Sequence, residues 1–493
     1  MAKSETDYSI QADQEVETKQ GRLALDFVEP GTDQEGVERV SQELPQGITS
    51  KMLYSDIVRI AWPSLVELTL TQLTSMVDLM MVGGLGPWAI TAVGLSVQPR
   101  FLSMTMFIAM NVGATAMVAR YRGAGKPEKA NEILRQALLL TLITSVLCGL
   151  AGYVYAEKLI QFMGASDAET LAGGTIYLQI QMLTLPIFAL TSTITATLRG
   201  VGHTRVAMTY NLVANLVNVV FNYLLINGHY GFPRLEVAGA SLATSIGQVV
   251  AFLMAMGAVM RGKHYLHLRL RDGFKPIPHH LYNIFNIGVP SMFEQLAMRT
   301  GAIIYVRTVA TLGTLAYATH QVGMNIQALS FMTGQAFAVS ATSLVGQSLG
   351  KKRSDFAQSY SNHTRRLGLV ISVILGITFF FFGRQIVSLY TDDQTIIEQG
   401  ARILKLVALI QPAQSSQFIL AGALRGAGDT RATAVVTFLT VLLVRPSLAI
   451  LTINAFGWGL DGAWIALVCD QLLRSGLILL RYRSGKWKKT RIK

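Results

Sequence analysis

The chain has 493 residues, of which 51% are hydrophobic and only 14% are charged, and its formal net charge is +13. A soluble protein carries about 25% charged residues, so this composition indicates that lipid is the main solvent. The short alternating segments of a membrane β-barrel are not found. Several apolar runs are instead long enough to cross about 30 Å of hydrocarbon as helices, namely 137–156, 206–226, 238–260 and 367–382. We therefore expect an all-α integral membrane protein.

Hydropathy and turn residues predict twelve transmembrane helices. In chain order they are expected at 57–82, 89–118, 136–156, 173–198, 206–226, 238–260, 283–310, 315–345, 366–383, 400–424, 432–453 and 462–481. Before them, residues 1–50 hold 11 acidic and 4 basic residues without an apolar core, which predicts a disordered tail and no signal peptide. Cys148 and Cys469 lie inside apolar runs and indicate neither a disulfide nor a metal site.

The basic residues are distributed unevenly between the predicted connections. Connections 83–88 and 311–314, which lead from an odd-numbered to an even-numbered span, have no Lys or Arg. The even-to-odd connections and the C-terminal stretch RYRSGKWKKTRIK are basic. The positive-inside rule then places these connections and both termini in the cytoplasm, in a multi-pass protein of the cell (inner) membrane. The net charge is thus a topology signal, and we expect the lipid bilayer, not a nucleic acid, as the large partner.

The chain repeats itself at a shift of 226 or 227 residues. Trp62–Glu67 (WPSLVE) recurs as Val289–Glu294 (VPSMFE), and Leu198–Arg205 (LRGVGHTR) recurs as Leu424–Arg431 (LRGAGDTR). One register held over this distance predicts two six-helix lobes, and because six is even their pseudo-twofold axis lies along the membrane normal. The predicted parts are the tail 1–50, an N-lobe 51–265, a cytoplasmic linker 266–280, a C-lobe 281–482 and a basic tail 483–493.

Ionisable groups inside a span cost at least about 3 kcal/mol each and are therefore functional candidates. The first span contains Glu67 and Asp78. Eleven residues correspond to three helical turns, so the two carboxylates share one face and lie about 16 Å apart along the axis. They line a polar stripe that could take up a proton or cation, or they are satisfied by hydrogen bonds between packed helices. Both interpretations remain open at this stage.

The fifth predicted span carries four asparagines at spacings of 4, 3 and 4, namely Asn211, Asn215, Asn218 and Asn222. Amides at this period lie on one helix face and hydrogen-bond to a neighbouring helix. They therefore indicate either contacts that join two helices or part of a polar site.

The second half keeps only part of this pattern. Glu294 repeats Glu67, but Tyr305 stands where Asp78 would, and Val444 and Leu448 replace two of the asparagines. The seventh span also carries Arg299, which lies near mid-depth and needs an acceptor that the sequence does not identify. The polar residues that we expect to line a substrate cavity in this half are Tyr305, Gln321, Asn325 and Gln414.

Four segments together resemble one family. Val77–Gly83 (VDLMMVG), Pro290–Gln295 (PSMFEQ), the two LRGxGxTR segments and Gly239–Thr244 (GASLAT) are similar to the multidrug and toxic compound extrusion (MATE) family, over residues 52–485. The resemblance implies an antiporter in which H⁺ or Na⁺ enters as amphiphilic, often cationic, organic compounds leave. Walker A, HExxH, GxSxG and His/Cys metal motifs are not found in the sequence, so we expect neither an enzyme nor a cofactor beyond the coupling ion.

The resemblance also assigns roles by position. Asp78 matches the first-helix aspartate that binds a proton or cation, and Asn218, Asn222 and Thr244 fall where the family builds the rest of that site. A Na⁺ would be held by Asp78, Asn218 and Asn222. Pro63 matches the proline at which the first helix bends.

In the second half the match is less complete. Glu294 corresponds to the seventh-helix glutamate of NorM-like members, whereas Gln414 stands where those members carry an aspartate. An amide can coordinate Na⁺ but cannot share its charge, so coupling to protons, chiefly in the first lobe, is favoured.

These residues suggest a mechanism and leave rival functions to consider. Ionised Asp78 and Glu294 would attract a cationic compound, and neutralisation by the incoming ion would release it outward. A flippase for lipid-linked oligosaccharides, of the same superfamily, is the alternative, but it would need several arginines for pyrophosphate. Only Arg299, Arg100 and Arg445 lie near mid-depth. A membrane enzyme or channel would need a catalytic cluster or a pore loop, and neither is found. We expect a monomer.

Overall fold

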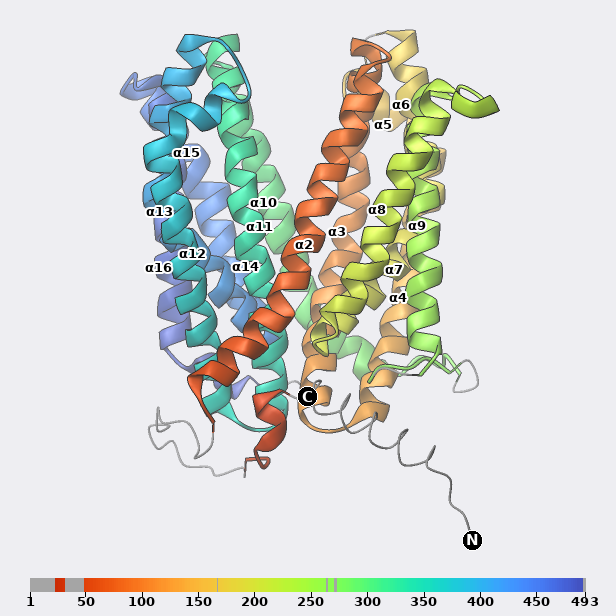
Figure 1. The fold of residues 1–493 in the computed structure, drawn as a ribbon, viewed down its shortest axis with the longest axis vertical. Helices are drawn as coiled ribbons and strands as arrows, with labels where there is room; N and C mark the ends of the chain where they lie inside the picture. Colours follow the sequence, from red (N-terminus) through yellow and green to blue (C-terminus); the bar gives the residue numbers. More distant parts are fainter. Residues whose placement is uncertain (1–22, 32–47, 166, 263–264, 270–272, 491–493) are drawn as a thin grey trace, which may run out of the picture.

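The computed structural model describes residues 23–31, 48–165, 167–262, 265–269 and 273–490. Within these residues the chain is all-α and forms twelve spans in two groups of six (Figure 1). Ten helices are individually long and apolar enough to cross a membrane, and an eleventh span is a bent helix pair. The remaining span is α10 (Pro278–Ala310), which has 33 residues. The twelve-helix, two-lobe fold predicted from the sequence is confirmed.

The N-lobe contains spans one to six. They are α2 (Ser50–Gly83), α3 (Pro87–Gly123), α4 (Pro127–Val154) followed by α5 (Ala156–Phe162), α6 (Ala168–Leu183) with α7 (Leu185–Gly200), α8 (Thr204–Asn227) and α9 (Glu236–Met260). The span predicted as 173–198 is bent by 50° between α6 and α7. Pro186 lies in the first turn of α7, where its missing N–H costs no intrahelical hydrogen bond, so the chain can restart there in a new direction.

The C-lobe contains spans seven to twelve. They are α10, α11 (Thr314–Gly350), α12 (Ser354–Ser388), α13 (Gln394–Gly426), the segmented span α14 (Thr430–Thr437), η4 (Phe438–Val444), α15 (Arg445–Ile450) and η5 (Leu451–Ala455), and α16 (Gly459–Arg483). The elements η4 and η5 are π-helical. The helix α12 starts 12 residues before the predicted boundary at 366. Hydropathy detects the lipid-immersed part of a helix, whereas the hydrogen-bonded helix continues into the polar region.

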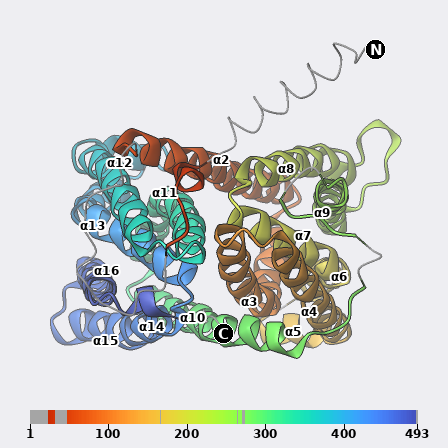
Figure 2. The same ribbon diagram turned by 90° about the horizontal axis from the view of Figure 1, so that it is seen from below.

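The lower halves of α2 and α10 pack against the opposite lobe. Ile57 and Ile60 of α2 share a core with Leu344 and Tyr360 of the C-lobe, and Ile284 of α10 belongs to the core of the N-lobe. Seen from below, α2 and α10 run along opposite sides of the junction between the lobes (Figure 2). Each lobe is therefore completed by the first helix of the other, which the repeat alone did not predict.

The lobes are in close contact at the end that carries η1 (Ala24–Phe27) and η6 (Lys486–Lys489), called here the termini face. Gly123 ends α3 and Gly350 ends α11, and the two are related by the repeat. A Cβ on Gly123 would overlap the carbonyl of Gln347, and a Cβ on Gly350 would overlap that of Arg120. Gln347 also donates to the Gly200 carbonyl at 3.1 Å. Toward the other end the two groups of ribbons diverge (Figure 1).

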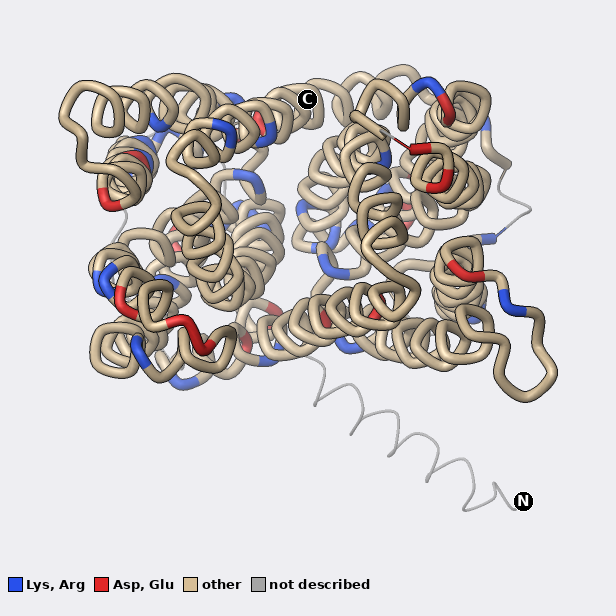
Figure 3. The backbone as a smooth tube through the Cα atoms, turned by 90° about the horizontal axis from the view of Figure 1, so that it is seen from above, with Lys and Arg blue, Asp and Glu red and all other residues tan. Residues whose placement is uncertain are grey.

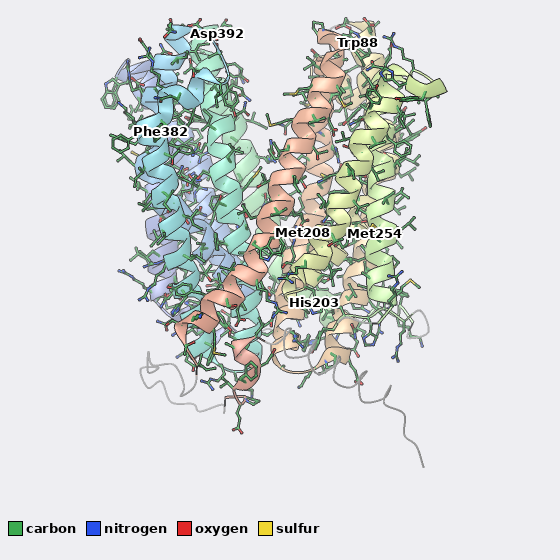
Figure 4. All side chains as sticks on the ribbon, in the orientation of Figure 1. Trp88, His203, Met208, Met254, Phe382 and Asp392 are labelled. Atoms are coloured by element: carbon green, nitrogen blue, oxygen red, sulfur yellow. The ribbon has the colours of Figure 1, made fainter. Side chains whose placement is uncertain are left out.

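The connections alternate between the two ends as predicted. Trp88 follows the connection between α2 and α3, and Asp392 lies in the connection between α12 and α13. Both residues lie at the end opposite the termini face, one in each lobe (Figure 4). His203, in the even-to-odd connection between α7 and α8, lies near the termini face (Figure 4). This connection is flanked by Arg199 and Arg205, so its basic residues share a side with the chain ends. The compartment that this side faces stays a prediction.

Residues 23–31 differ from the disordered tail expected for 1–50. Leu25 is 2% exposed and packs into the C-lobe core, while the backbone N–H of Ala24 donates to Asp56 of α2 at 2.8 Å. Lys351 Nζ donates to the Leu25 carbonyl at 2.7 Å. The apolar triplet Leu23–Leu25 interrupts a polar stretch, and its burial stabilises this segment against the C-lobe. Residues 1–22 and 32–47 lie outside the described residues.

Candidate functional site

Asp78 of α2 faces amides of α8 inside the N-lobe. Asn222 Nδ2 donates to Asp78 Oδ1 at 2.5 Å. With the Asn218 amide nitrogen turned toward the carboxylate, it donates to the same oxygen at 2.9 Å, and the Asn218 oxygen then accepts from Thr244 Oγ1 of α9 at 3.2 Å. The structure thus brings together the four residues that the sequence placed in one N-lobe site. They come from three helices that pack side by side.

No ion pair to Asp78 occurs among the described residues, although Arg100 of α3 acts on its carboxylate through space. The carboxylate is therefore held by neutral donors. The Asn222 amide oxygen is buried, and the described part of the chain offers it no hydrogen-bond partner. A carboxylate beside amide and hydroxyl oxygens is a ligand set for a proton or for a small hard cation.

Glu67 lies on the same helix as Asp78 but belongs to a different cluster. Its Oε1 forms an ion pair with Arg199 of α7 at 2.7 Å and accepts from Asn211 of α8 at 2.5 Å. The carboxylate side chain is 6% exposed. Asn215 donates to Thr71 at 3.2 Å, one turn nearer to Asp78. Asn211 and Asn215 therefore join α8 to α2, which is the contact that the asparagine spacing allowed.

Glu294 is paired in the same way in the C-lobe. Arg425 donates to Glu294 Oε1 at 2.6 Å, and Thr433 donates to Oε2 at 3.0 Å. Glu67 and Glu294 are repeat-related, and so are Arg199 and Arg425. The sequence analysis used these two arginines only as topology signals. The shared shift of glutamate and LRG motif predicts that a pair formed in one lobe recurs in the other, although it does not reveal the pair itself.

The C-lobe also holds an ion network that sequence reasoning missed. Asp470 of α16 is 0% exposed, and its Oδ2 accepts from Arg445 of α15 and from Arg474 of α16. Arg474 in turn acts through space on Glu294. Acidic and basic segments accordingly occur within both lobes when the molecule is seen along its axis (Figure 3). Asp470 and Arg474 stand inside an apolar predicted span, which was sufficient reason to single them out.

Arg299 of α10 lies over the ring of Phe101 of α3, with 3.4 Å between the guanidinium carbon and the ring centroid. Phe101 belongs to the N-lobe, so this cation–π contact joins the lobes near mid-depth. The partner that the sequence could not identify is therefore an aromatic ring. Arg445 and Arg474 of the C-lobe are both bound to Asp470, so neither arginine is free to bind a pyrophosphate.

The residues predicted to line a cavity in the C-lobe divide into two groups. Gln321 and Asn325 are exposed on one face of α11. Tyr305 and Gln414 are 2% and 1% exposed and lie inside the lobe, where Gln414 lines a cavity of about 10 Å³, so a role for either in substrate binding stays a prediction. The Tyr305 hydroxyl donates to the Ala463 carbonyl at 2.9 Å. Gln414 accepts from Gln327 at 3.3 Å. A polar residue in an apolar span can hydrogen-bond to a neighbouring helix or contact a ligand. The sequence alone does not distinguish these two roles.

Two further expectations concern α2 and metals. Pro63 is buried within α2, which stays helical from Ser50 to Gly83, and the lower part of the helix leans toward the C-lobe (Figure 1). Among the described residues, no group of three or more His, Cys, Asp or Glu side chains could hold a metal ion.

Known proteins are similar to this chain in sequence. A sequence model of the MatE family matches residues 63–224 and 290–451, one match in each lobe. The probable multidrug resistance protein NorM of Thermotoga maritima is 29% identical over 435 residues, which cover 88% of this chain and 93% of that protein. The multidrug resistance protein NorM of Vibrio cholerae is 26% identical over 388 residues, or 78% of this chain and 84% of its own.

Solved structures show the same fold. A MATE transporter crystallised in a bent conformation matches with a TM-score of 0.81 at 22% identity, covering 89% of this chain and 96% of its own. An outward-facing multidrug resistance MATE transporter matches with the same TM-score at 23% identity, covering 89% and 97%. Two six-span lobes that each complete the other define a membrane transporter of the two-lobe type. Because the family model matches both lobes, this chain belongs to the MatE family, and it is a NorM-like MATE transporter.

Proposed function

We propose that the protein exports amphiphilic or cationic organic compounds in exchange for H⁺ or Na⁺, by alternating access to the space between its lobes. The observation that carries the proposal is the Asp78 site. Of the four acids at depth in the spans, Glu67, Glu294 and Asp470 are ion-paired to arginines, whereas Asp78 is bound by amides. The names of the relatives from T. maritima and V. cholerae, both multidrug resistance proteins, agree with this function.

A carboxylate held by neutral donors can change its charge without breaking a direct ion pair to an arginine. Binding of a proton or Na⁺ to Asp78 would remove its attraction for a cationic compound in the lobe interior. A ligand shifts the equilibrium between the inward-facing and outward-facing states only if it binds them with different affinities. The Asp78 site must therefore bind its ion more tightly in one of these two states than in the other. The hydrogen bonds from Asn218 and Asn222 connect Asp78 of α2 to α8. Binding of an ion at Asp78 would change these hydrogen bonds and thereby the packing of α2 against α8.

Coupling to protons is our preferred form of the proposal. A Na⁺ could be held by Asp78, Asn218 and Asn222 through oxygen atoms. Those amide oxygens carry no formal charge, and Gln414 offers no second acid in the C-lobe. A proton needs only the one carboxylate. Glu294 was expected to share this role, but its ion pair with Arg425 makes it a weaker candidate.

The proposed direction of export uses the charge asymmetry of the connections. The termini face carries the basic connections, so we place it in the cytoplasm and the protein in the cell (inner) membrane. The compound would enter the space between the lobes from that side and leave at the opposite end. The contacts of Gly123 and Gly350 at the termini face would have to open for entry.

The test is export by the Asp78→Asn variant in reconstituted vesicles. A fluorescent cationic dye is loaded, and an imposed pH gradient or an imposed Na⁺ gradient is applied. We expect Asp78→Asn to abolish gradient-driven transport while the protein remains inserted and folded, and Ser75→Ala, on an exposed position of the same helix, to leave it unchanged. The gradient that drives the wild type identifies the ion. Unimpaired transport by Asp78→Asn would overturn the assignment.

A further inference from the structure

A cavity of about 230 Å³ opens at the termini face between α12, α16 and the C-terminal segment. Its volume is far above the 10–15 Å³ that one water molecule needs. The side chains that matter are Arg365 of α12, Arg483 at the end of α16, Lys488 of η6, and the amides of Gln358 and Asn362. Three cations from three elements therefore surround one hollow, and no acidic side chain is among its described lining residues.

The positive charge of this cavity is not neutralised by the neighbours that the structure describes. Arg365 and Arg483 form no hydrogen bond or ion pair with the described part of the chain. Lys488 Nζ donates to Gln358 Oε1 at 2.5 Å, which is a neutral partner. The carboxylate that acts on Lys488 is Asp355, and it is already bound by Arg353 Nε at 2.9 Å. Partial burial lowers the pKa of Lys488, so an anion in the cavity would restore the stability of its charged form.

The floor of the cavity is built from packed aromatic rings. Trp487 is 0% exposed and stacks on Tyr482, with 5.2 Å between ring centroids and 15° between planes. Its Nε1 donates to the Tyr482 carbonyl at 2.9 Å. The segment after α16 is thereby fixed against the helix, and the cavity exists before any ligand binds. Rings of this kind are enriched where a membrane protein meets the lipid headgroups.

We propose that this cavity binds a phosphate group, supplied by an anionic phospholipid of the adjoining leaflet. Guanidinium groups match phosphate oxygens in pairs, and clustered basic residues at the cytoplasmic ends of spans bind anionic headgroups. The lipid source is favoured because exposed apolar side chains continue from the cavity along both helices, with Val373 three turns beyond Asn362 on α12 and Leu472 two turns before Leu479 on α16. Acyl chains could follow these side chains. The lipid assignment rests on the proposed cytoplasmic position of the termini face, where anionic lipids are concentrated.

The cavity is connected to the contact between the lobes. The same segment that supplies Trp487 and Lys488 ends at Thr490, whose carbonyl accepts from Arg120 of α3 at 2.8 Å. Arg120 belongs to the N-lobe, next to the close approach of α3 and α11. A phosphate bound to Arg365, Arg483 and Lys488 would hold the segment in place and thereby favour the arrangement in which the termini face is closed.

The test measures binding to the full-length protein in neutral detergent. The probes are short-chain phosphatidylglycerol, short-chain phosphatidylcholine and inorganic phosphate, with bound lipid counted by native mass spectrometry and Tm followed during titration. We expect phosphatidylglycerol to bind and to raise Tm, and the Arg365→Gln/Arg483→Gln double variant to bind it about ten- to thirtyfold more weakly. Arg366→Gln is the matched control, since Arg366 is exposed on the next position of α12 and does not line the cavity.

Each outcome decides between the alternatives. Phosphatidylglycerol binding that inorganic phosphate does not displace supports the lipid source, and displacement at millimolar phosphate supports a site for free phosphate. Equal binding by the wild type and the double variant, or an equal loss in Arg366→Gln, overturns the proposal. The result is independent of the transport assignment, because Asp78→Asn is expected to bind the lipid normally even where it has lost export.

Discussion

Each lobe contains one buried glutamate–arginine ion pair, whereas the aspartates within their spans have different partners. Glu67 with Arg199 in the N-lobe and Glu294 with Arg425 in the C-lobe are related by the repeat and have nearly the same separation, 2.7 and 2.6 Å. Beyond this pair, the N-lobe carries Asp78 among amides, whereas the C-lobe carries an aspartate between two arginines. The duplicated pair therefore belongs to the packing of each lobe.

This difference indicates where the charge can change. A carboxylate bound to arginines stays ionised, because neutralising it would leave a buried cation uncompensated. A carboxylate among amides can gain or lose a cation at a lower cost. The sequence analysis expected Glu294 to lack an acidic partner, because Gln414 replaces it, and expected Asp78, Asn218 and Asn222 to have no counterparts in the C-lobe. The structure adds that the glutamate–arginine pair is duplicated, whereas the site around Asp78 is not.

The largest effect should come from breaking the C-lobe network. We expect Asp470→Asn to reduce the free energy of unfolding by about 3–5 kcal/mol, because Arg445 and Arg474 would be left buried without their common acceptor. The yield of folded, monodisperse protein and its Tm measure this. Asp78→Asn should cost less than about 1 kcal/mol, since Asp78 is bound by amides and the one arginine that acts on it, Arg100, does so only through space.

A similar loss of stability in both aspartate variants would contradict the comparison. It would show that Asp78 supports the fold in the same way as Asp470. If Asp470→Asn folds normally but loses export, the C-lobe network takes part in coupling instead.

The second effect concerns the duplicated pair. Glu67→Gln and Glu294→Gln should each lower the free energy of unfolding by about 2–3 kcal/mol, and by similar amounts, because each removes a charged partner from a half-buried arginine. Export per folded molecule should remain coupled to the same gradient. Thermal unfolding and vesicle transport, normalised to inserted protein, check both statements.

Loss of coupling in Glu294→Gln alone would restore the role that the family resemblance assigned to Glu294. A double-mutant cycle with Arg425→Gln separates the two cases. If Glu294 and Arg425 form a structural pair, their interaction energy should be close to that of Glu67 and Arg199 in the corresponding cycle. If Glu294 links the ion gradient to transport, Glu294→Gln loses transport whether or not Arg425 is present.

Much of this molecule could be predicted from its sequence, and the reasons for the rest are physical. Twelve spans and two lobes followed from hydropathy and from the repeat, whereas the group around Asp78 was implied by the family resemblance. The ion pairs did not, since Glu67 and Arg199 are far apart in the chain and only packing of α2 against α7 and α8 brings them together. The crossing of α2 and α10 between lobes and the burial of Tyr305 also depend on tertiary packing. The segment around Leu25 was missed because three apolar residues form no periodic pattern.

The third effect uses the repeat-related glycines of the termini face. Gly123→Ala and Gly350→Ala should each weaken the contact between α3 and α11 by about 1–3 kcal/mol, because the added methyl group meets a backbone carbonyl of the other helix. Spin labels at Lys126 and Lys352, with Cys148 and Cys469 replaced, should then report longer distances across this face. Gly257→Ala is the control, since nothing lies within 4 Å of its Cβ position. Unchanged distances in both variants would mean that the lobes tolerate the methyl groups by local shifts.

The smallest effect should come from Asp26→Asn in the N-terminal segment. Asp26 forms an ion pair with Arg122 of α3 at 3.8 Å, and both side chains are about one-third exposed or less. An exposed pair at this distance contributes less than about 1 kcal/mol and is screened by salt. The other contacts of this segment are to the C-lobe, through Leu25 and Lys351, and to the lower part of α2, through Ala24 and Asp56, where α2 itself packs against the C-lobe. The same label pair should therefore show little change in Asp26→Asn at low salt and none at high salt. A large change would mean that the segment holds the two lobes together, whereas a small one means that it moves with the C-lobe when the termini face opens.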